Sequence, residues 1–300
     1  MRRILAWLKK VKWLKVGGYG GLFIFSFLLS LYLTFPYDSI RDYAIRVIQS
    51  RADVSVKIDN VSTFRLTGIK AKGLKIASQE DPTKVYLNLD EVRLRVRPTQ
   101  MMRRRLWIDF DVYGYGGGVA GSLCKRGTVW DVAMNFAGLK FAEYSTRELF
   151  KNLGSINIEG NLNGELDAHL NRALPRVNYG ALNLGLDHMK TSNVMIAGQK
   201  IPDMTFEPGK IDMELQHQSL QVKEFDLKGN HLEMQLNGRI NTNMEDIKKS
   251  RLALTCKIKP SDEMEDALGP MMYALKEPDA NGFYTIPING VPGNLRAGRR

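Results

Sequence analysis

The chain has 300 residues, of which 44% are hydrophobic and 25% are charged, a balance typical of globular proteins rather than disordered ones. Two cysteines exclude a disulfide-dense scaffold and four-cysteine metal sites, and four histidines leave little room for a multi-histidine metal site. The formal net charge is +11, but six positive charges lie in residues 1–35, which hold no acid, so only +5 remains for the rest. This distribution gives little support to a nucleic-acid partner, and we expect none.

The first predicted element is a transmembrane helix over residues 17–35. These 19 residues carry no charge. As a helix they would reach about 29 Å, close to the ~30 Å hydrocarbon core of a bilayer. Six basic residues precede the segment and none follows it before Arg41. The positive-inside rule therefore places residues 1–16 in the cytoplasm as a basic stub, and the rest of the chain across the membrane.

A cleaved signal peptide is the alternative interpretation of this segment. The apolar region of a signal peptide is shorter and ends at a small-residue cleavage site, whereas residues 33–36 read LTFP. The sequence therefore favours an uncleaved anchor. In residues 2–15, Ile4, Leu8 and Val11 recur at helical spacing among basic residues. That pattern is typical either of a helix lying on anionic lipid or of a basic flank that sets topology.

The next unit, residues 36–52, is predicted to be a short amphipathic helix. Ser39, with Asp42 three residues later, resembles a capping box. The apolar residues follow helical spacing, and they are Ile40, Tyr43, Ala44, Val47 and Ile48. Such a stripe must be buried against the end of a β structure or on the membrane surface. We expect it to cap a β structure through Ile40, Tyr43, Val47 and Ile48.

Residues 53–300 are predicted to form one β-rich domain, because the period of the apolar residues changes from 3.6 to 2. Runs with one apolar face include residues 54–58, 85–89, 92–96, 106–112, 130–136, 182–186, 211–215, 232–240 and 252–258. Short turns separate them, so about fifteen strands are expected. The phase slips by one residue at Asp90 and Glu91, which indicates a β-bulge.

Two helices are predicted to interrupt these strands. Residues 144–153 carry apolar residues at helical spacing and stop at Gly154. Residues 261–276 begin at Ser261, which suits an N-cap, and acids fill the first turn. Pro270 should break or kink this second helix.

The predicted fold class is mainly β: a long antiparallel meander curled into a groove or an open, barrel-like sheet, with one N-terminal transmembrane helix and a few short helices. The sequence lacks the strand–helix–strand rhythm that indicates a parallel sheet. The apolar face of so many strands needs a cover. The sheet can roll on itself, pair with a second sheet or leave a groove for an apolar ligand, and the alternation leaves all three open.

The candidate binding residues follow from strand phase. In residues 211–215 and 232–236 the apolar side chains share one phase, which predicts an apolar groove or core face lined by Ile211, Met213, Leu215, Leu232, Met234 and Leu236. Strand side chains alternate, so their neighbours should face outward. These neighbours are Asp212, Glu214, Glu233 and Gln235.

No sequence motif predicts catalysis, a cofactor or a metal site. Residues 116–121 match G-x-G-x-x-G, but no helix is expected after them, so a glycine-rich hairpin is the better interpretation. The histidines lack metal-ligand spacing. Residues 103–105 are three arginines, which form either a solvated turn or a grip on lipid phosphates or an acidic partner. Cys124 and Cys256 either form a disulfide or, for Cys256 on an apolar face, leave a buried thiol.

A basic stub, one membrane span, a short amphipathic helix and a long β meander follow one another in this chain. In that order they resemble the GspN proteins associated with type II secretion, which in turn look like small relatives of AsmA-type periplasmic proteins. The matching segments are residues 61–69, 113–118, 158–166, 201–240 and 282–290. The resemblance covers nearly the whole chain and carries no catalytic positions. It implies a non-enzymatic envelope protein with a curled sheet and an apolar concave face.

The leading functional prediction is a non-enzymatic component associated with type II protein secretion, which acts through assembly or interaction. We expect it in the cell inner membrane as a single-pass protein, with its N-terminus cytoplasmic and its C-terminal domain periplasmic. The alternative is an AsmA-like lipid-binding or lipid-transfer protein with an apolar groove between the inner and outer membranes. The partners implied are the inner membrane, type II secretion subunits and phospholipid, and no cofactor is expected.

Overall fold

The computed structural model describes residues 17–23, 26–27, 30, 37–50, 54–65, 67–79, 85–140, 157–196, 199–243, 249–269, 272, 275, 277–291 and 294–297. The predicted basic stub, part of the predicted span and the predicted helix at 144–153 lie outside these residues. Residues 17–23 are helical. Within the described ranges, no helix combines the length and the apolar character needed to cross a membrane.

Strands dominate the described part of the chain. The elements are α3 (Tyr37–Gln49), β1 (Val54–Lys57), β2 (Asn60–Phe64), β3 (Gly68–Ser78), β4 (Val85–Val96), α4 (Pro98–Met101), β5 (Leu106–Gly114), β6 (Gly117–Arg126), β7 (Val129–Lys140), β8 (Asn157–Asn171), η4 (Pro175–Val177), β9 (Tyr179–Ser192), β10 (Met195–Ile196), β11 (Gln199–Lys200), β12 (Met204–Thr205), β13 (Gly209–Gln216), β14 (Ser219–Lys228), β15 (Leu232–Asn241), β16 (Arg251–Pro260), α5 (Asp262–Leu268), β17 (Tyr284–Val291) and β18 (Asn294–Ala297).

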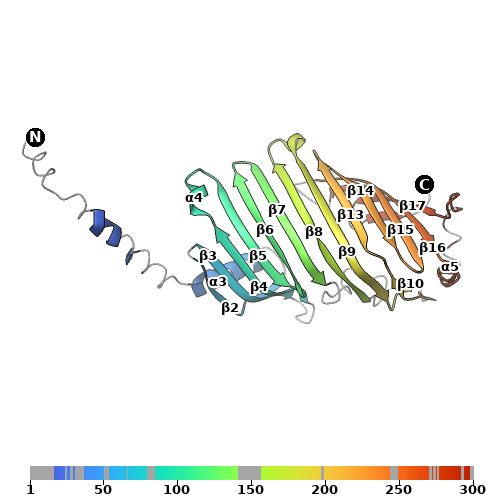
Figure 1. Ribbon diagram of the computed structural model, residues 1–300, viewed down its shortest axis with the longest axis horizontal. Coiled ribbons are helices and arrows are strands. Elements are labelled where there is room, and N and C mark those ends of the chain that lie inside the picture. The colour runs from blue at the N-terminus through green and yellow to red at the C-terminus, as the bar shows by residue number, and fades with distance from the viewer. Residues whose placement is uncertain are drawn as a thin grey trace, which may run out of the picture.

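Sixteen of these strands form one long antiparallel sheet (Figure 1). Its order is β1-β3-β4-β5-β6-β7-β8-β9-β13-β14-β15-β16-β17-β18, with β2 paired to β3 and β12 paired to β9. From β3 to β9 and from β13 to β18, each strand pairs with the next one along the chain, as in an antiparallel meander. The first and last strands of this path do not pair, so the sheet is open. The predicted fold class, mainly β with a long antiparallel meander and few short helices, is confirmed at this level.

The glycine-rich segment at 116–121 forms a hairpin. Gly114 pairs with Gly117, and the two residues between them, Tyr115 and Gly116, have φ of 54° and 67°. Two positive φ angles are what a two-residue type I′ turn requires. β6 continues from this turn as a strand, so the helix that a phosphate-binding loop needs is missing at this position.

At Asp90 and Glu91, where the sequence predicts a β-bulge, the structure has no bulge confined to β4. Lys72 pairs with Glu91 and Leu74 pairs with Leu89, so the offset between β3 and β4 is the same on both sides of the slip. β3 therefore changes phase at the same level as β4. Gly73 lies at that level with φ of +63°, a backbone conformation that favours glycine. The correction to the predicted bulge is that both strands change phase together.

The short helices agree with the sequence prediction in type more than in length. α3 lies within the predicted unit 36–52 and contacts β1 and β2. α5 begins where predicted, because the Ser261 side chain accepts a hydrogen bond from the Met264 backbone N–H. It ends at Leu268 with Gly269 as its C-cap, well before the predicted end at residue 276. The helix therefore stops ahead of Pro270.

Candidate functional site

One unbroken row of apolar residues and glycines crosses twelve strands of the sheet, from β3 to β17. Directly paired residues of an antiparallel ladder point to the same face. In sheet order the row is Ile69, Leu94, Phe110, Gly121, Met134, Leu166, Leu182, Met213, Val222, Gly238, Leu254 and Ile288. We call the side of the sheet that carries this row the apolar face, and the other side the polar face.

The six predicted groove residues all lie on the apolar face. Met213 is part of the row itself, and Ile211 and Leu215 share its phase on β13. On β15, Leu236 pairs with Cys256 of β16, and Met234 pairs with Leu227 and Ile258. Leu232 pairs with Pro260. The register thus gathers residues from two separated segments into one continuous surface.

The predicted outward-facing residues pair with other polar residues on the polar face. Asp212 pairs with Asn183, and Gln235 pairs with Asp226 and Lys257. One row of this face, read from β4 to β17, is Arg95, Asp109, Ser122, Ala133, Asp167, Ala181, Glu214, Gln221, Arg239, Ala253 and Asn289. The contrast between the faces therefore extends across almost the whole sheet.

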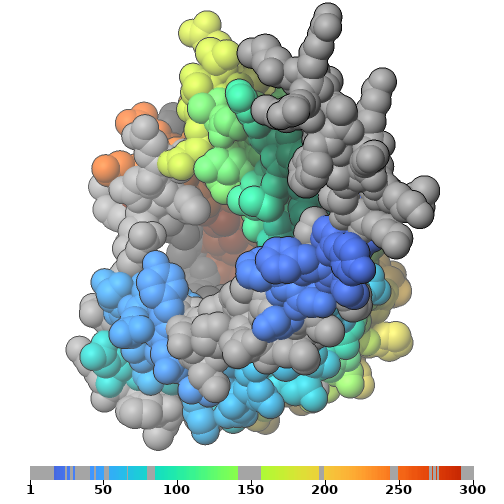
Figure 2. Space-filling view, turned by 90° about the vertical axis from the view of Figure 1, so that its left-hand side faces the viewer, coloured from blue at the N-terminus to red at the C-terminus, as the bar shows by residue number. Residues whose placement is uncertain are grey.

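The apolar face is only half-buried along much of its length. Phe110, Met134 and Leu166 are half-buried, and Leu94 is 43% exposed. Burial increases toward the C-terminal strands, where Leu254 is buried. Viewed from its N-terminal end, the molecule is hollowed between the blue and cyan N-terminal residues and the green and yellow strands (Figure 2). A closed core would bury these side chains fully, so the N-terminal half of the face is accessible.

A buried cluster covers the apolar face at the ends of β8 and β15. It consists of Val194, Ile201, Met204 and Met264. Ile158 of β8 and Leu232 of β15 pack against it. The segment after β9 and the helix α5 therefore cover the apolar face at these strand ends.

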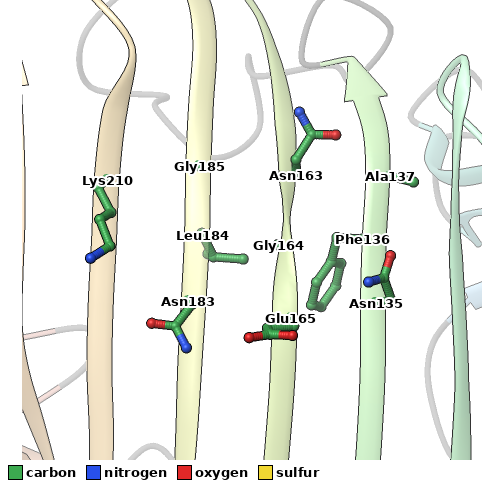
Figure 3. Close-up of a pocket in the computed structure, with 10 residues that line it drawn as sticks. All are labelled: Asn135, Phe136, Ala137, Asn163, Gly164, Glu165, Asn183, Leu184, Gly185 and Lys210. Carbon is green, nitrogen blue, oxygen red and sulfur yellow. The ribbon is translucent and has the colours of Figure 1, made fainter.

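A hollow of about 580 Å³ lies at the centre of the sheet, where β7, β8, β9 and β13 run side by side (Figure 3). The Phe136 ring and the Leu184 side chain both point toward Gly164 from the strands on either side. These three residues form a second apolar row, because Phe136 pairs with Gly164 and Gly164 pairs with Leu184. The hollow is within the range of ligand pockets, and its lining combines this apolar row with polar neighbours such as Asn135, Glu165 and Lys210.

The polar face carries a charged network on β4 and β5. The Asp109 carboxylate accepts hydrogen bonds from Arg97 at 2.8 Å, Arg95 at 2.7 Å and the Trp107 indole at 2.9 Å. These donors, with Arg97 first, lower the pKa of Asp109 from its ordinary value near 3.8 to about 2, against the opposing effect of burial. The Arg97 guanidinium also lies 4.8 Å from the centroid of the Trp107 ring. Each charge of this network is paired, so it is a structural feature.

The predicted apolar stripe of α3 is less buried than expected. Tyr43 is 65% exposed and Ile48 is 37% exposed, while Val47 is half-buried. The side chain of Ile40 lies outside the described positions. Among the described residues, the main contacts of α3 with the sheet are to β1 and β2, and Tyr43 and Ile48 lie on a side of the helix that stays open. The correction is that Tyr43 and Ile48 contribute little to the contact between α3 and the sheet.

The two cysteines are free thiols, which corrects the disulfide alternative. Cys124 lies on β6 and Cys256 on β16, and six strands separate them in the sheet. Cys256 is on the apolar face, as its phase predicted, and pairs with Leu236 and Ile286. Burial raises the pKa of the Cys256 thiol, which makes it a poor nucleophile.

Among the described residues, no group of three or more His, Cys, Asp or Glu side chains is placed to hold a metal ion. His169 lies 2.6 Å from Asp131 and stacks on the Tyr179 ring. His188 and His217 have positive φ. None of these three histidines belongs to a group of potential metal ligands among the described residues.

Comparisons with protein-family models, curated proteins and solved structures give no match for this chain. The resemblance to GspN and AsmA-type proteins therefore stays a prediction from the sequence.

Proposed function

We propose that this chain is a non-enzymatic envelope protein whose apolar face holds the acyl chains of phospholipid. In this proposal residues 17–35 anchor the protein in the inner membrane and the sheet lies in the periplasm. The single observation that carries it is the unbroken apolar row from Ile69 to Ile288, which is half-buried over much of its length.

The shape of this surface supports an extended apolar ligand. Neighbouring strands lie about 4.8 Å apart, so a row across twelve strands is about 50 Å long. A compact cofactor would need an enclosed pocket, whereas a flexible hydrocarbon chain needs a long surface with little directional bonding. Leaving an apolar strip of this size in water is unfavourable, and such patches in natural proteins mark interaction sites.

A photo-cross-linking experiment on the full-length protein in native membranes tests this proposal. A benzophenone amino acid replaces Leu94 or Leu236 on the apolar face, or Gln235 on the polar face as the matched control. Irradiation should give adducts with the mass of a phospholipid at positions 94 and 236 and not at 235. Equal adducts on both faces, or none on the apolar face, would overturn the proposal.

A variant separates binding from folding. Leu94 is 43% exposed, so Leu94→Asp should leave the sheet folded, with an unchanged melting temperature. The introduced carboxylate lies in the path of the acyl chain. Covering a charged group with hydrocarbon removes it from water, which is unfavourable. A benzophenone amino acid at Phe110, which pairs with Leu94 on the next strand, should therefore give several-fold less phospholipid adduct in this variant. A folded Leu94→Asp protein with undiminished adduct would count against one continuous binding surface.

A component of type II secretion is the second candidate. It is supported by the sequence resemblance to GspN proteins and by the open ends of the sheet, since edge strands such as β18 offer backbone groups for strand addition. Affinity purification of the full-length protein from its native membranes tests it. Stoichiometric recovery of secretion-system subunits is expected, and their absence would remove this candidate.

A further inference from the structure

Three strand connections meet along one edge of the sheet. They are residues 97–105 between β4 and β5, residues 127–128 between β6 and β7, and residues 172–178 between β8 and β9. The register brings them to the same side, because Leu106 pairs with Lys125 and Val129 pairs with Asn171. α4 and the β8–β9 connection both lie at the upper ends of their strands in Figure 1. We call these connections, with the strand ends that flank them, the basic edge.

All charged residues of the basic edge are positive. Residues 97–106, 125–130 and 171–179 contain no aspartate or glutamate. Their basic residues are Arg97, Arg103, Arg104, Arg105, Lys125, Arg126, Arg172 and Arg176. Arg97 is paired with Asp109, whereas none of the arginines at 103–105 forms an ion pair with a described carboxylate. The edge therefore presents a field that favours anions.

The opposite edge differs in charge. Its connection between β16 and β17, residues 261–283, carries six acids against one basic residue, Lys276; the acids are Asp262, Glu263, Glu265, Asp266, Glu277 and Asp279. On the edge that carries the basic connections, the β15–β16 connection is mixed, with Glu245 and Asp246 against Lys248 and Lys249. The purely basic charge therefore belongs to the three connections between β4 and β9, and these suit an anionic surface.

Large apolar side chains project from the same basic edge. Met102 is 89% exposed, Met101 55%, Leu174 61% and Val177 48%. The turn that carries the methionines has a fixed shape, because the backbone N–H groups of Arg103 and Arg105 donate to the Gln100 carbonyl oxygen. Exposed apolar side chains between basic ones are typical of segments that lie in a membrane interface, where the arginines reach lipid phosphates.

We propose that the basic edge docks on a bilayer that contains anionic phospholipid, with Met101 and Met102 in the headgroup region and the neighbouring arginines on lipid phosphates. An acidic protein would match the charge, but it would not account for the exposed methionines at 101 and 102 or for the exposed Leu174 and Val177. This docking presents the strand ends, and with them the apolar face, to the lipid surface. The inference rests on the proposed membrane location, but it does not require lipid to be bound on the apolar face.

The test places a polarity-sensitive fluorophore on a cysteine introduced by Met102→Cys in the full-length protein, reconstituted into vesicles. Cys124 and Cys256 are 6% and 8% exposed, so the introduced thiol is labelled selectively. In vesicles of phosphatidylglycerol and phosphatidylcholine, the emission should shift to the blue and be quenched by nitroxide-labelled acyl chains. In pure phosphatidylcholine, or at high salt, the quenching should fall several-fold.

The matched control is Met195→Cys, because Met195 is 47% exposed and follows β9 at the opposite edge. Its label should stay in water in both kinds of vesicle.

In the Met102→Cys background, Arg103→Gln with Arg104→Gln should weaken the response, by about fivefold per arginine removed. A label at position 102 that is not quenched in anionic vesicles, as expected for a protein partner, would overturn the inference. So would equal quenching without anionic lipid. Either result leaves the cross-linking test of the apolar face unaffected, so the two proposals fail separately.

Discussion

The pKa of Asp109 is about 2, well below its ordinary value of 3.8. Its side chain is 20% exposed and is held by two arginines and a tryptophan. Such a network stabilises the fold only while the carboxylate is charged. Its consequence is therefore a dependence of stability on pH.

We predict that Asp109→Asn lowers the free energy of unfolding at neutral pH. The folded-state pKa of about 2 lies below the ordinary value of 3.8, so the stabilisation is present above about pH 4 and is lost as the pH falls toward 2. The shift corresponds to about 2 kcal/mol. Denaturant unfolding followed by tryptophan fluorescence should show this loss at pH 7, and the difference from the wild type should shrink between pH 4 and pH 2.

Asp167→Asn is the matched control, because Asp167 is an exposed carboxylate in the same row of the polar face. Its replacement should change the stability by less than about 0.5 kcal/mol. A loss at Asp109 that stays constant from pH 7 to pH 2 would contradict the electrostatic explanation.

At the scale of the strand, glycines differ in what surrounds them. Gly121 lies in the apolar row on β6, and a Cβ added there would lie 2.3 Å from the Ala133 carbonyl oxygen and 2.7 Å from the Phe110 ring. Gly185 on β9 is open, since its nearest neighbour would be the Asn163 carbonyl oxygen at 3.9 Å. Neither glycine has a positive φ, so space alone separates them.

Gly121→Ala should therefore destabilise the sheet by about 1–3 kcal/mol, because the added methyl group forces β6 away from β7. Gly185→Ala should stay within about 0.5 kcal/mol of the wild type or slightly stabilise it, since alanine loses less backbone entropy on folding. Thermal melts of the two variants make the comparison. Equal melting temperatures would mean that β6 and β7 adjust freely at this point.

At the scale of the whole molecule, the predicted basic stub and the sheet should lie on opposite sides of the membrane that the predicted anchor crosses. The basic residues before position 17 and the uncharged segment 17–35 predict an N-in, C-out orientation without cleavage. Alkaline phosphatase fused after Arg300 should be active in a Gram-negative host, and the same enzyme fused after residue 16 should be inactive. An inactive C-terminal fusion, or a mature N-terminus near Asp38, would contradict this topology.

The sequence by itself determined which residues share a face. Strand alternation has a period of two, so Ile211, Met213 and Leu215 had to point to the same side whatever their neighbours were. The same local reasoning placed the start of α5 at Ser261, because a capping hydrogen bond joins residues three apart. The glycine-rich hairpin at 116–121 was likewise predictable, since a two-residue turn depends on its own φ angles.

The tertiary structure alone decided how the faces of separate strands combine. The apolar row joins Ile69 to Ile288 only because eleven strand pairings fix their registers in succession, and no local pattern encodes pairing between distant segments. The basic edge arises in the same way. Sequence analysis singled out residues 103–105, but Arg126, Arg172 and Arg176 join them only when the hairpins align. The net charge of an edge is summed over all the connections that the fold brings side by side. No single stretch of the chain therefore shows it.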